Sequence, residues 1–93
     1  MSATGPLIDE AEGKRFVQPF EGGEVFCDYA SRGEVRALLH VEADPDLRGS
    51  GAAGQFMAAL VEHGRAHGLT FTPVCGYAVA WFRRHPDAAD VLA

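Results

Sequence analysis

The sequence predicts an α+β domain that combines an antiparallel β-meander, one further strand and two main helices. Before position 44, short apolar segments are separated by turns that contain glycine, which is typical of a meander. A helical stripe of apolar residues then follows a loop of small residues, and a short strand-like segment separates it from a second helical segment. We therefore expect one compact domain over 14–93, after a loosely ordered lead-in over 1–13.

The meander is expected to contain three strands, at 14–19, 24–31 and 34–41. Pro19 favours an end to the first strand, because proline cannot donate a hydrogen bond to a sheet. Glycines in the two connecting turns suit the positive φ angles of tight hairpins. The third strand is the most continuous in apolar residues, so we expect it to be the most buried. Within the lead-in, Leu7-Ile8 could begin an edge strand.

The first helix is expected over 51–67, where apolar side chains recur at helical spacing. Gly68 follows as a stop signal. The segment 69–73 is expected to be a short strand that packs back beside the third strand of the meander. A second helix is expected over 78–85, closed by Pro86, with at most one further turn from Asp87 onward.

The loop before the first helix points to a class of ligand. In Arg48-Gly49-Ser50-Gly51-Ala52-Ala53, small residues directly precede the helical stripe. The first N–H groups of a helix have no partner within it, and the helix dipole adds positive potential at the same place. Glycines let a phosphate approach the backbone closely. The loop therefore predicts binding of a phosphorylated cofactor.

Two other interpretations of this loop are available. Residues 49–54 also match G-x-G-x-x-G, the fingerprint of dinucleotide binding. That fingerprint requires a parallel βαβ unit and an acidic residue about twenty positions further on. The segment 69–81 contains no Asp or Glu, and the strands before the loop are predicted to be antiparallel, so a nicotinamide dinucleotide is disfavoured. The other interpretation is a glycine-rich turn that only caps the helix.

Four motifs together resemble the short single-domain YjdJ-type N-acetyltransferases of the GNAT superfamily. They are His40-Val41-Glu42, Leu47-Arg48-Gly49-Ser50-Gly51-Ala52-Ala53, Pro73-Val74-Cys75-Gly76-Tyr77 and Arg84-His85-Pro86-Asp87. The resemblance runs from about Arg15 to the C-terminus. It implies a compact, truncated GNAT fold that binds acetyl-CoA as a cosubstrate.

The resemblance also implies where CoA would bind. The backbone N–H groups of the loop, at Arg48, Gly49, Ser50, Gly51, Ala52 and Ala53, would hold the pyrophosphate. The pantetheine arm would lie in a V-shaped opening between strands 35–41 and 69–73, beside Val41, Pro73 and Cys75. The chain departs from the family pattern at Gly76 and lacks the C-terminal strands of larger GNAT enzymes. The amine-pocket residues of those enzymes are therefore not carried over.

Acetyl transfer to an amine needs a base for the amine proton, a polarised thioester carbonyl and an acid for the leaving thiolate. His40 and Glu42, at the end of the third strand, are the candidate bases, and backbone N–H groups near them could polarise the carbonyl. Tyr77 is the candidate acid. A packed or capping histidine is the alternative interpretation of His40, and an aromatic core residue that of Tyr77.

The two cysteines occupy different predicted positions. Cys75 lies between a strand end and a helix start, and helix N-termini favour the thiolate form of a cysteine. A covalent acetyl intermediate on Cys75 and a small buried hydrophobic residue both remain open for this position. Cys27 lies in the middle of a strand and is expected to be an inert core residue.

Composition excludes several other classes of function. The formal net charge of −5 and the absence of a long Lys/Arg run disfavour nucleic acid as a partner. No apolar run has the length of a membrane span and the N-terminus has no signal pattern, so we expect a cytoplasmic protein without a membrane partner. His63 and His67 lie four residues apart without a third ligand nearby, so we expect a solvent-facing pair and no metal site.

Together with the resemblance, these patterns predict an acetyl-CoA-dependent N-acetyltransferase. Its partners would be a CoA thioester and a primary amine, carried by a small molecule or a protein lysine. The alternative is an acyl-CoA-binding module with little or no turnover, which the missing C-terminal strands favour. The chain is expected to be a monomer or a weak dimer.

Overall fold

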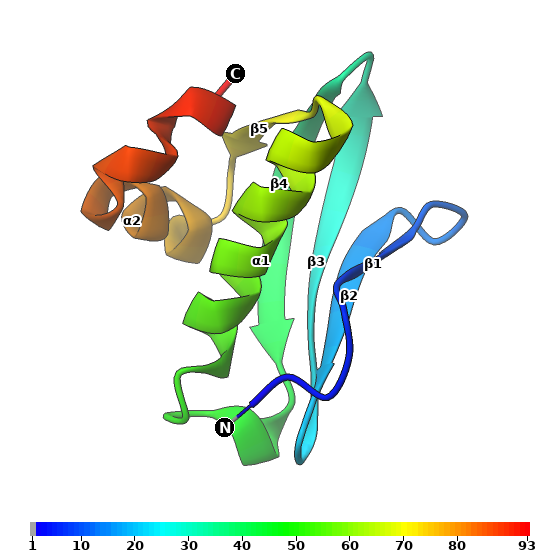
Figure 1. Cartoon of the computed structure of the whole chain (residues 1–93), viewed down its shortest axis with the longest axis vertical. Helices are drawn as coiled ribbons and strands as arrows, with labels where there is room; N and C mark the ends of the chain where they lie inside the picture. The colour runs from blue at the N-terminus through cyan, green and yellow to red at the C-terminus, as the bar shows by residue number, and fades with distance from the viewer. Residues whose placement is uncertain (1) are drawn as a thin grey trace.

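The chain folds into one sheet with its helices packed against it (Figure 1). The computed structural model describes residues 2–93; Met1, the first residue of the expected lead-in, lies outside the described residues. The expected elements are all present, with ends within two residues of the predicted ones. The strands are β1 (Ile8–Glu10), β2 (Arg15–Phe20), β3 (Gly23–Arg32), β4 (Val35–Ala43) and β5 (Thr70–Pro73). The helices are α1 (Ala52–His67) and α2 (Gly76–Arg84), with 3₁₀ turns η1 (Pro45–Leu47) and η2 (Pro86–Val91).

The sheet is mixed, which confirms the predicted α+β class. Its order is β1-β2-β3-β4-β5, so every strand lies beside its neighbour in the sequence. The first four strands are antiparallel, whereas β5 runs parallel to β4. A parallel pair needs a crossover connection, and α1 supplies it.

Helix α1 lies against one face of the sheet, roughly along β4, and forms the centre of the core (Figure 1). Its side chains Phe56, Met57 and Leu60 are fully buried. They pack in one apolar cluster with alternate residues of the sheet, such as Phe16 and Phe71, and with residues of α2 and η2. Burial of side chains of this size stabilises a fold by roughly 1.5–3 kcal/mol each. The cluster therefore fixes α1, and with it the loop at its N-terminus, relative to the sheet.

Residues 2–13, the described part of the expected lead-in, contact the sheet. Strand β1 pairs with β2 through Ile8 and Val17, and the hydroxyl of Tyr29 donates a hydrogen bond to Asp9 at 2.5 Å. Arg15 adds an ion pair with Glu10 at 2.9 Å. The edge strand that could begin at Leu7-Ile8 is confirmed as β1. The side-chain contacts of Asp9 and Glu10 were not indicated by the sequence pattern, because they depend on how the strands pair.

The prediction that the third strand would be the most buried is wrong. In β4 only Leu38 is buried, whereas the adjacent Leu39 is 44% exposed. The reason is topological. Strand β5 ends at Pro73, which pairs with Leu38, and the chain then turns into α2. The remainder of β4 consequently has no strand on that side.

The C-terminal region is more ordered than a single turn. Turn η2 spans Pro86–Val91, and the N–H of Ala93 then donates a hydrogen bond to the carbonyl of Phe71 on β5. Ala88 and Val91 are buried against the core, which explains why the segment packs rather than frays. Helix α2 also begins two residues earlier than expected, at Gly76, because Cys75 caps it.

Candidate functional site

The loop before α1 has the backbone geometry of an anion-binding turn. Gly49 and Gly51 have φ angles of 80° and 86°, in the left-handed region that disfavours residues with a side chain. A Cβ at either position would meet no atom within 4 Å, so open space borders the loop. The chain therefore needs glycine here for conformation, and the same choice leaves the backbone accessible to a ligand.

The N-terminus of α1 retains unused donors. Ser50 accepts a hydrogen bond from the N–H of Ala52 at 3.2 Å and donates one to the carbonyl of Leu47. Within the part of the chain that the structure describes, the N–H groups of Ala53 and Gly54 have no hydrogen-bond acceptor. Unpaired donors at the positive end of a 16-residue helix favour an anion.

A gap opens in the sheet close to this helix. Strand β5 pairs with β4 only from Val35 to Leu38. The N–H groups of Val74 and Cys75 both donate to the carbonyl of Leu38, at 3.0 and 3.2 Å, and close the parallel pairing there. Beyond this point β4 has a free backbone edge from Leu39 to Ala43. An opening beside β4 therefore lies where the V-shaped opening was expected, but it arises because β5 ends at Pro73 and not because paired strands separate.

A bulge in β4 lies at the mouth of the opening. The pairing with β3 shifts between Asp28 and Tyr29, so that Leu39 has no partner on β3. Bulges bend a strand and redirect its backbone groups. The bulge comes directly before His40. The backbone N–H groups near His40 and Glu42, which were expected to polarise the thioester carbonyl, therefore lie next to this irregular part of the strand.

Cys75 lies at this opening and caps α2. Its Sγ accepts a hydrogen bond from the N–H of Ala78 at 3.4 Å, and the side chain is partly buried against the core cluster. Cys27 is fully buried on the neighbouring strand β3. Burial, together with the nearby Cys75, raises the pKa of the Cys27 thiol to about 12. The two thiols thus differ in access and in local environment.

His40 and Glu42 form a pair, but on the opposite face of the sheet from Val41. The His40 Nε2 and Glu42 Oε1 atoms are 3.2 Å apart, and both side chains are more than half exposed. His40 packs edge-on against Phe26 of β3. Val41 pairs with the buried Cys27 and faces the helices. The pair is accessible from solvent, so His40 is not a core residue, although its ring packs against Phe26.

A groove of about 470 Å³ runs between α1 and α2. Its α1 wall consists of small residues near the loop, Gly51, Gly54 and Ala58. Its α2 wall carries Tyr77, which is 38% exposed and therefore not a core aromatic residue. Burial raises the pKa of Tyr77, so its hydroxyl stays protonated at neutral pH. The groove thus connects the helix N-terminus to the predicted acid, whereas Cys75, His40 and Glu42 do not line it.

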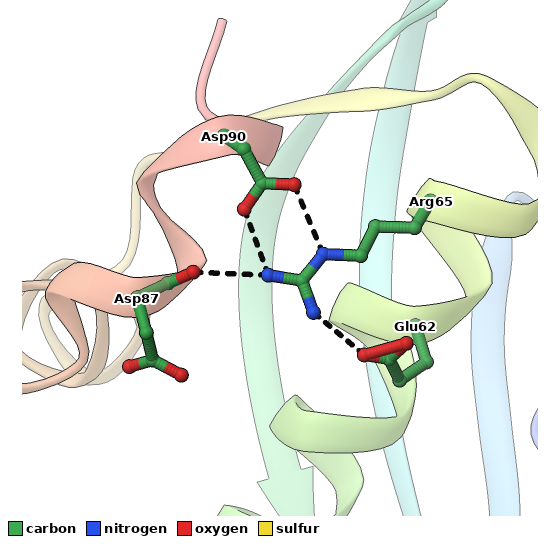
Figure 2. Close-up of polar contacts among 4 residues, drawn as sticks. All are labelled: Glu62, Arg65, Asp87 and Asp90. Carbon is green, nitrogen blue, oxygen red and sulfur yellow. Dashed lines mark hydrogen bonds and ion pairs between the residues drawn. The ribbon is translucent and has the colours of Figure 1, made fainter.

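Arg65 and Glu62, which also line the groove, belong to a polar cluster with Asp87 and Asp90 (Figure 2). The Arg65 guanidinium binds both carboxylate oxygens of Asp90, at 2.9 and 2.8 Å, and the carboxylate of Glu62 at 2.6 Å. It also donates to the backbone carbonyl of Asp87 at 2.9 Å. These contacts attach η2 to α1 and use all three guanidinium nitrogens.

The described residues contain no cluster that could hold a metal ion. His63 and His67 stack at 4.1 Å between ring centroids, and His63 also packs edge-on against Phe16. Burial lowers the pKa of His63, and the neighbouring His67 adds to this effect. The expectation that both rings face solvent is therefore correct only for His67, because the His63 ring is half-buried. Over residues 2–93, no helix is long and apolar enough to cross a membrane.

Comparison with known proteins identifies the family. The family model described as GCN5-related N-acetyl-transferase matches residues 15–91, which is most of the chain. The chain belongs to the GCN5-related N-acetyltransferase family. The extent of the match agrees with the predicted resemblance, whereas the narrower YjdJ-type assignment stays a prediction. A search of curated proteins found no match.

A solved structure supports the same GCN5-related fold. The solution structure of a "GCN5-like putative N-acetyltransferase" from Staphylococcus aureus superposes with a TM-score of 0.69 at 19% sequence identity. The alignment covers 100% of this chain and 91% of that chain. The small sheet and two main helices are therefore shared between two proteins of similar length whose sequences have diverged widely.

Sequence reasoning named Tyr77 but missed the groove wall that it forms on α2 with Trp81 and Arg84. Tyr77, Trp81 and Arg84 recur at intervals of four and three residues, which places them on one face of a helix. This spacing was visible in the sequence. It does not by itself predict a groove, because the opposite wall on α1 consists of small residues. Those residues leave open space only once the two helices are packed together.

Proposed function

We propose that this chain is an acetyl-CoA-dependent N-acetyltransferase that transfers an acetyl group to a primary amine, on a small molecule or a protein lysine. One observation carries the proposal. The unused N–H donors of Ala53 and Gly54 open α1 beside the free backbone edge of β4. A pyrophosphate bound at these N–H donors and a pantetheine arm extended along the free edge of β4 would bring the thioester towards Cys75. Cytoplasmic location stays a prediction.

The proposed cofactor fits the residues present. The loop from Arg48 to Ala53 offers backbone donors and open space, which suits the pyrophosphate. The pantetheine arm contains amides, which can pair with the unpaired groups of β4 as an added strand would. Val41 and Pro73 flank the opening from its two sides. CoA, when bound, supplies the activated acetyl group as a thioester.

In the direct mechanism, the amine nitrogen attacks the thioester carbonyl carbon. A C–N bond forms, the C–S bond breaks, and the sulfur leaves with the electron pair. An amine that approached from the sheet face opposite the helices would pass its proton to the His40–Glu42 pair, and Tyr77 would protonate the leaving thiolate from the helix side. N–H groups near the bulge at Leu39 would stabilise the oxyanion of the tetrahedral intermediate.

In the covalent variant, the Cys75 thiolate attacks the acetyl carbon first. The C–S bond to CoA breaks, CoA leaves as the thiolate and takes a proton from Tyr77, and a thioester remains on Cys75 until the amine displaces it. The position of Cys75 at the N-terminus of α2, where its Sγ accepts a backbone hydrogen bond, favours this variant. Both variants give the same products, so only trapping of the intermediate separates them.

A second candidate function is acyl-CoA binding with little or no turnover. It is favoured by the exposed positions of His40 and Glu42, because a base that is open to water has no enclosed pocket for the amine. In this case the protein would bind CoA thioesters through the same loop and opening, and a partner would respond to the bound state.

Mass spectrometry tests the proposal. The intact protein is incubated with acetyl-CoA, alone and with a library of primary amines and lysine peptides. Formation of acetylated amine that depends on the protein supports the enzyme, and a gain of one acetyl group on Cys75 supports the covalent variant. Tight binding of acetyl-CoA without either product would favour the binding module. Absence of both binding and product would refute the proposed function.

A further inference from the structure

The groove between the helices has one basic position that the described chain leaves unpaired. Arg84 lines the groove from α2, on the same helical face as Tyr77 and Trp81. Its side chain is exposed, and it makes no hydrogen bond or ion pair with any residue over 2–93. Its charge is close enough to Tyr77 to lower the pKa of that hydroxyl and oppose the effect of burial.

The other arginine of the groove is already used. Arg65 binds Asp90 and Glu62, and it donates to the carbonyl of Asp87 (Figure 2). Its charge is therefore neutralised by the protein itself. Arg84 is left as the basic group in the groove lining that could bind an additional anion, and the wall opposite is open because Gly54 and Ala58 carry little or no side chain.

The chemistry of CoA supplies such an anion. Besides its pyrophosphate, CoA carries a phosphate monoester on the 3′ carbon of the ribose. A pyrophosphate at the N-terminus of α1 would place the ribose beside Gly51 and Gly54, where the groove begins. A guanidinium matches a phosphate monoester well, because it can donate two parallel hydrogen bonds and carries a fixed charge.

We propose that Arg84 binds the 3′-phosphate of CoA and so makes the protein select CoA over 3′-dephospho-CoA. The inference rests on the proposed function and extends it to a specificity-determining residue. Arg84 also lies in the last turn of α2, where a cation interacts favourably with the helix dipole. Arg83 also lies in the last turn but does not line the groove. A substitution of Arg83 therefore tests the effect of charge at the helix end without the effect of phosphate binding in the groove.

Calorimetric titration with CoA and with 3′-dephospho-CoA tests the proposal. The wild-type chain is expected to bind CoA about tenfold more tightly, since a hydrogen bond between charged groups contributes on the order of 1.4 kcal/mol or more. Arg84→Gln is expected to reduce this ratio to about one, with little change in the affinity for 3′-dephospho-CoA. Arg84→Glu is expected to invert the preference. Arg83→Gln, the matched control, is expected to keep the wild-type ratio.

The outcomes separate this inference from the proposed function. If the wild type binds both ligands and Arg84→Gln keeps the tenfold ratio, or weakens both ligands equally, the assignment of Arg84 is wrong and CoA binding stands. If the wild type binds neither ligand, the proposed function fails and the inference with it. Both arginines are exposed, and thermal unfolding of each variant verifies that the fold is retained.

Discussion

At the scale of single residues, the two cysteines show how position determines reactivity. Cys27 is buried in β3, and its thiol has a pKa of about 12, mainly because burial disfavours the thiolate. Cys75 is partly exposed at the N-terminus of α2 and accepts a backbone hydrogen bond. The thiolate is the reactive form of cysteine, so the two residues should differ strongly in rate.

We expect a thiol reagent at pH 7–8 to label Cys75 at least tenfold faster than Cys27. Below pH 10 the Cys27 thiol stays almost entirely protonated, so its labelling should remain slow as the pH is raised from 7 to 9. CoA should slow the labelling of Cys75. Peptide mapping of the labelled protein measures both rates. Equal rates for the two cysteines, or no protection by CoA, would show that Cys75 is not at the thioester.

At the scale of elements, the loop and α1 act as one unit. Gly51 is the N-cap of α1 in the left-handed conformation, and the unpaired N–H groups of Ala53 and Gly54 begin two residues later. A β-branched residue at this position would strain the backbone and shield those donors.

We expect Gly51→Val to weaken CoA binding at least tenfold and to lower stability by about 1–2 kcal/mol, because a left-handed backbone is unfavourable for valine. Calorimetry and thermal unfolding measure the two effects. Gly33→Val is the control: Gly33 is also left-handed at a φ of 59°, but lies in the β3–β4 turn far along the chain from the loop. That variant should lose stability and keep its CoA affinity. Unchanged affinity in Gly51→Val would contradict the role of the loop.

Helix α1 also depends on a glycine for its packing. A Cβ at Gly64 would lie 2.6 Å from the ring of Phe71 and 3.2 Å from the carbonyl of Leu69. Gly54, in the same helix, has no atom within 4 Å of such a Cβ. We expect Gly64→Ala to destabilise the fold by about 1–3 kcal/mol through overpacking.

Gly54→Ala should instead stabilise the fold by up to about 1 kcal/mol, since alanine has the higher helix propensity. Chemical denaturation of both variants gives the comparison directly. If Gly64→Ala proved as stable as Gly54→Ala, the close approach of α1 to β5 would have to be revised.

At the scale of the whole molecule, Arg65 connects the first helix to the C-terminal turn (Figure 2). The Arg65 guanidinium lowers the pKa of Asp90 below its ordinary value of 3.8 by hydrogen bonding and by charge. A carboxylate with a lowered pKa contributes to stability above its unfolded pKa, and this contribution is lost as the pH falls through its folded pKa.

We therefore expect Asp90→Asn to lower the Tm at pH 7, with a modest effect because the pair is exposed. The difference in Tm between variant and wild type should stay constant from pH 7 to about 5. It should disappear below pH 3.8, where wild-type Asp90 also becomes neutral. Thermal unfolding followed across this range is the measurement. A difference that grew on acidification would have the wrong sign for this pair.

Much of the fold was predictable because its signals are local. The stripe from Phe56 to Val61 and the stop at Gly68 defined α1, and alternating residues defined the meander. The position of the predicted anion-binding loop followed from its place directly before α1. The exposure of Leu39 and the burial of Ala88 were not predictable, because each depends on where β5 ends and how η2 returns to the sheet.

The sequence by itself determined the order of elements, the loop at the head of α1 and the resemblance to the GNAT superfamily, since each resides in contiguous residues. Only the tertiary structure decided which faces meet. It placed His40 and Glu42 on the opposite sheet face from Val41, opened β4 beyond Leu38, and left Arg84 unpaired while Arg65 was neutralised. The physical reason is that burial, strand pairing and ion pairing join residues distant in the chain, and no local pattern records which partners will be brought together.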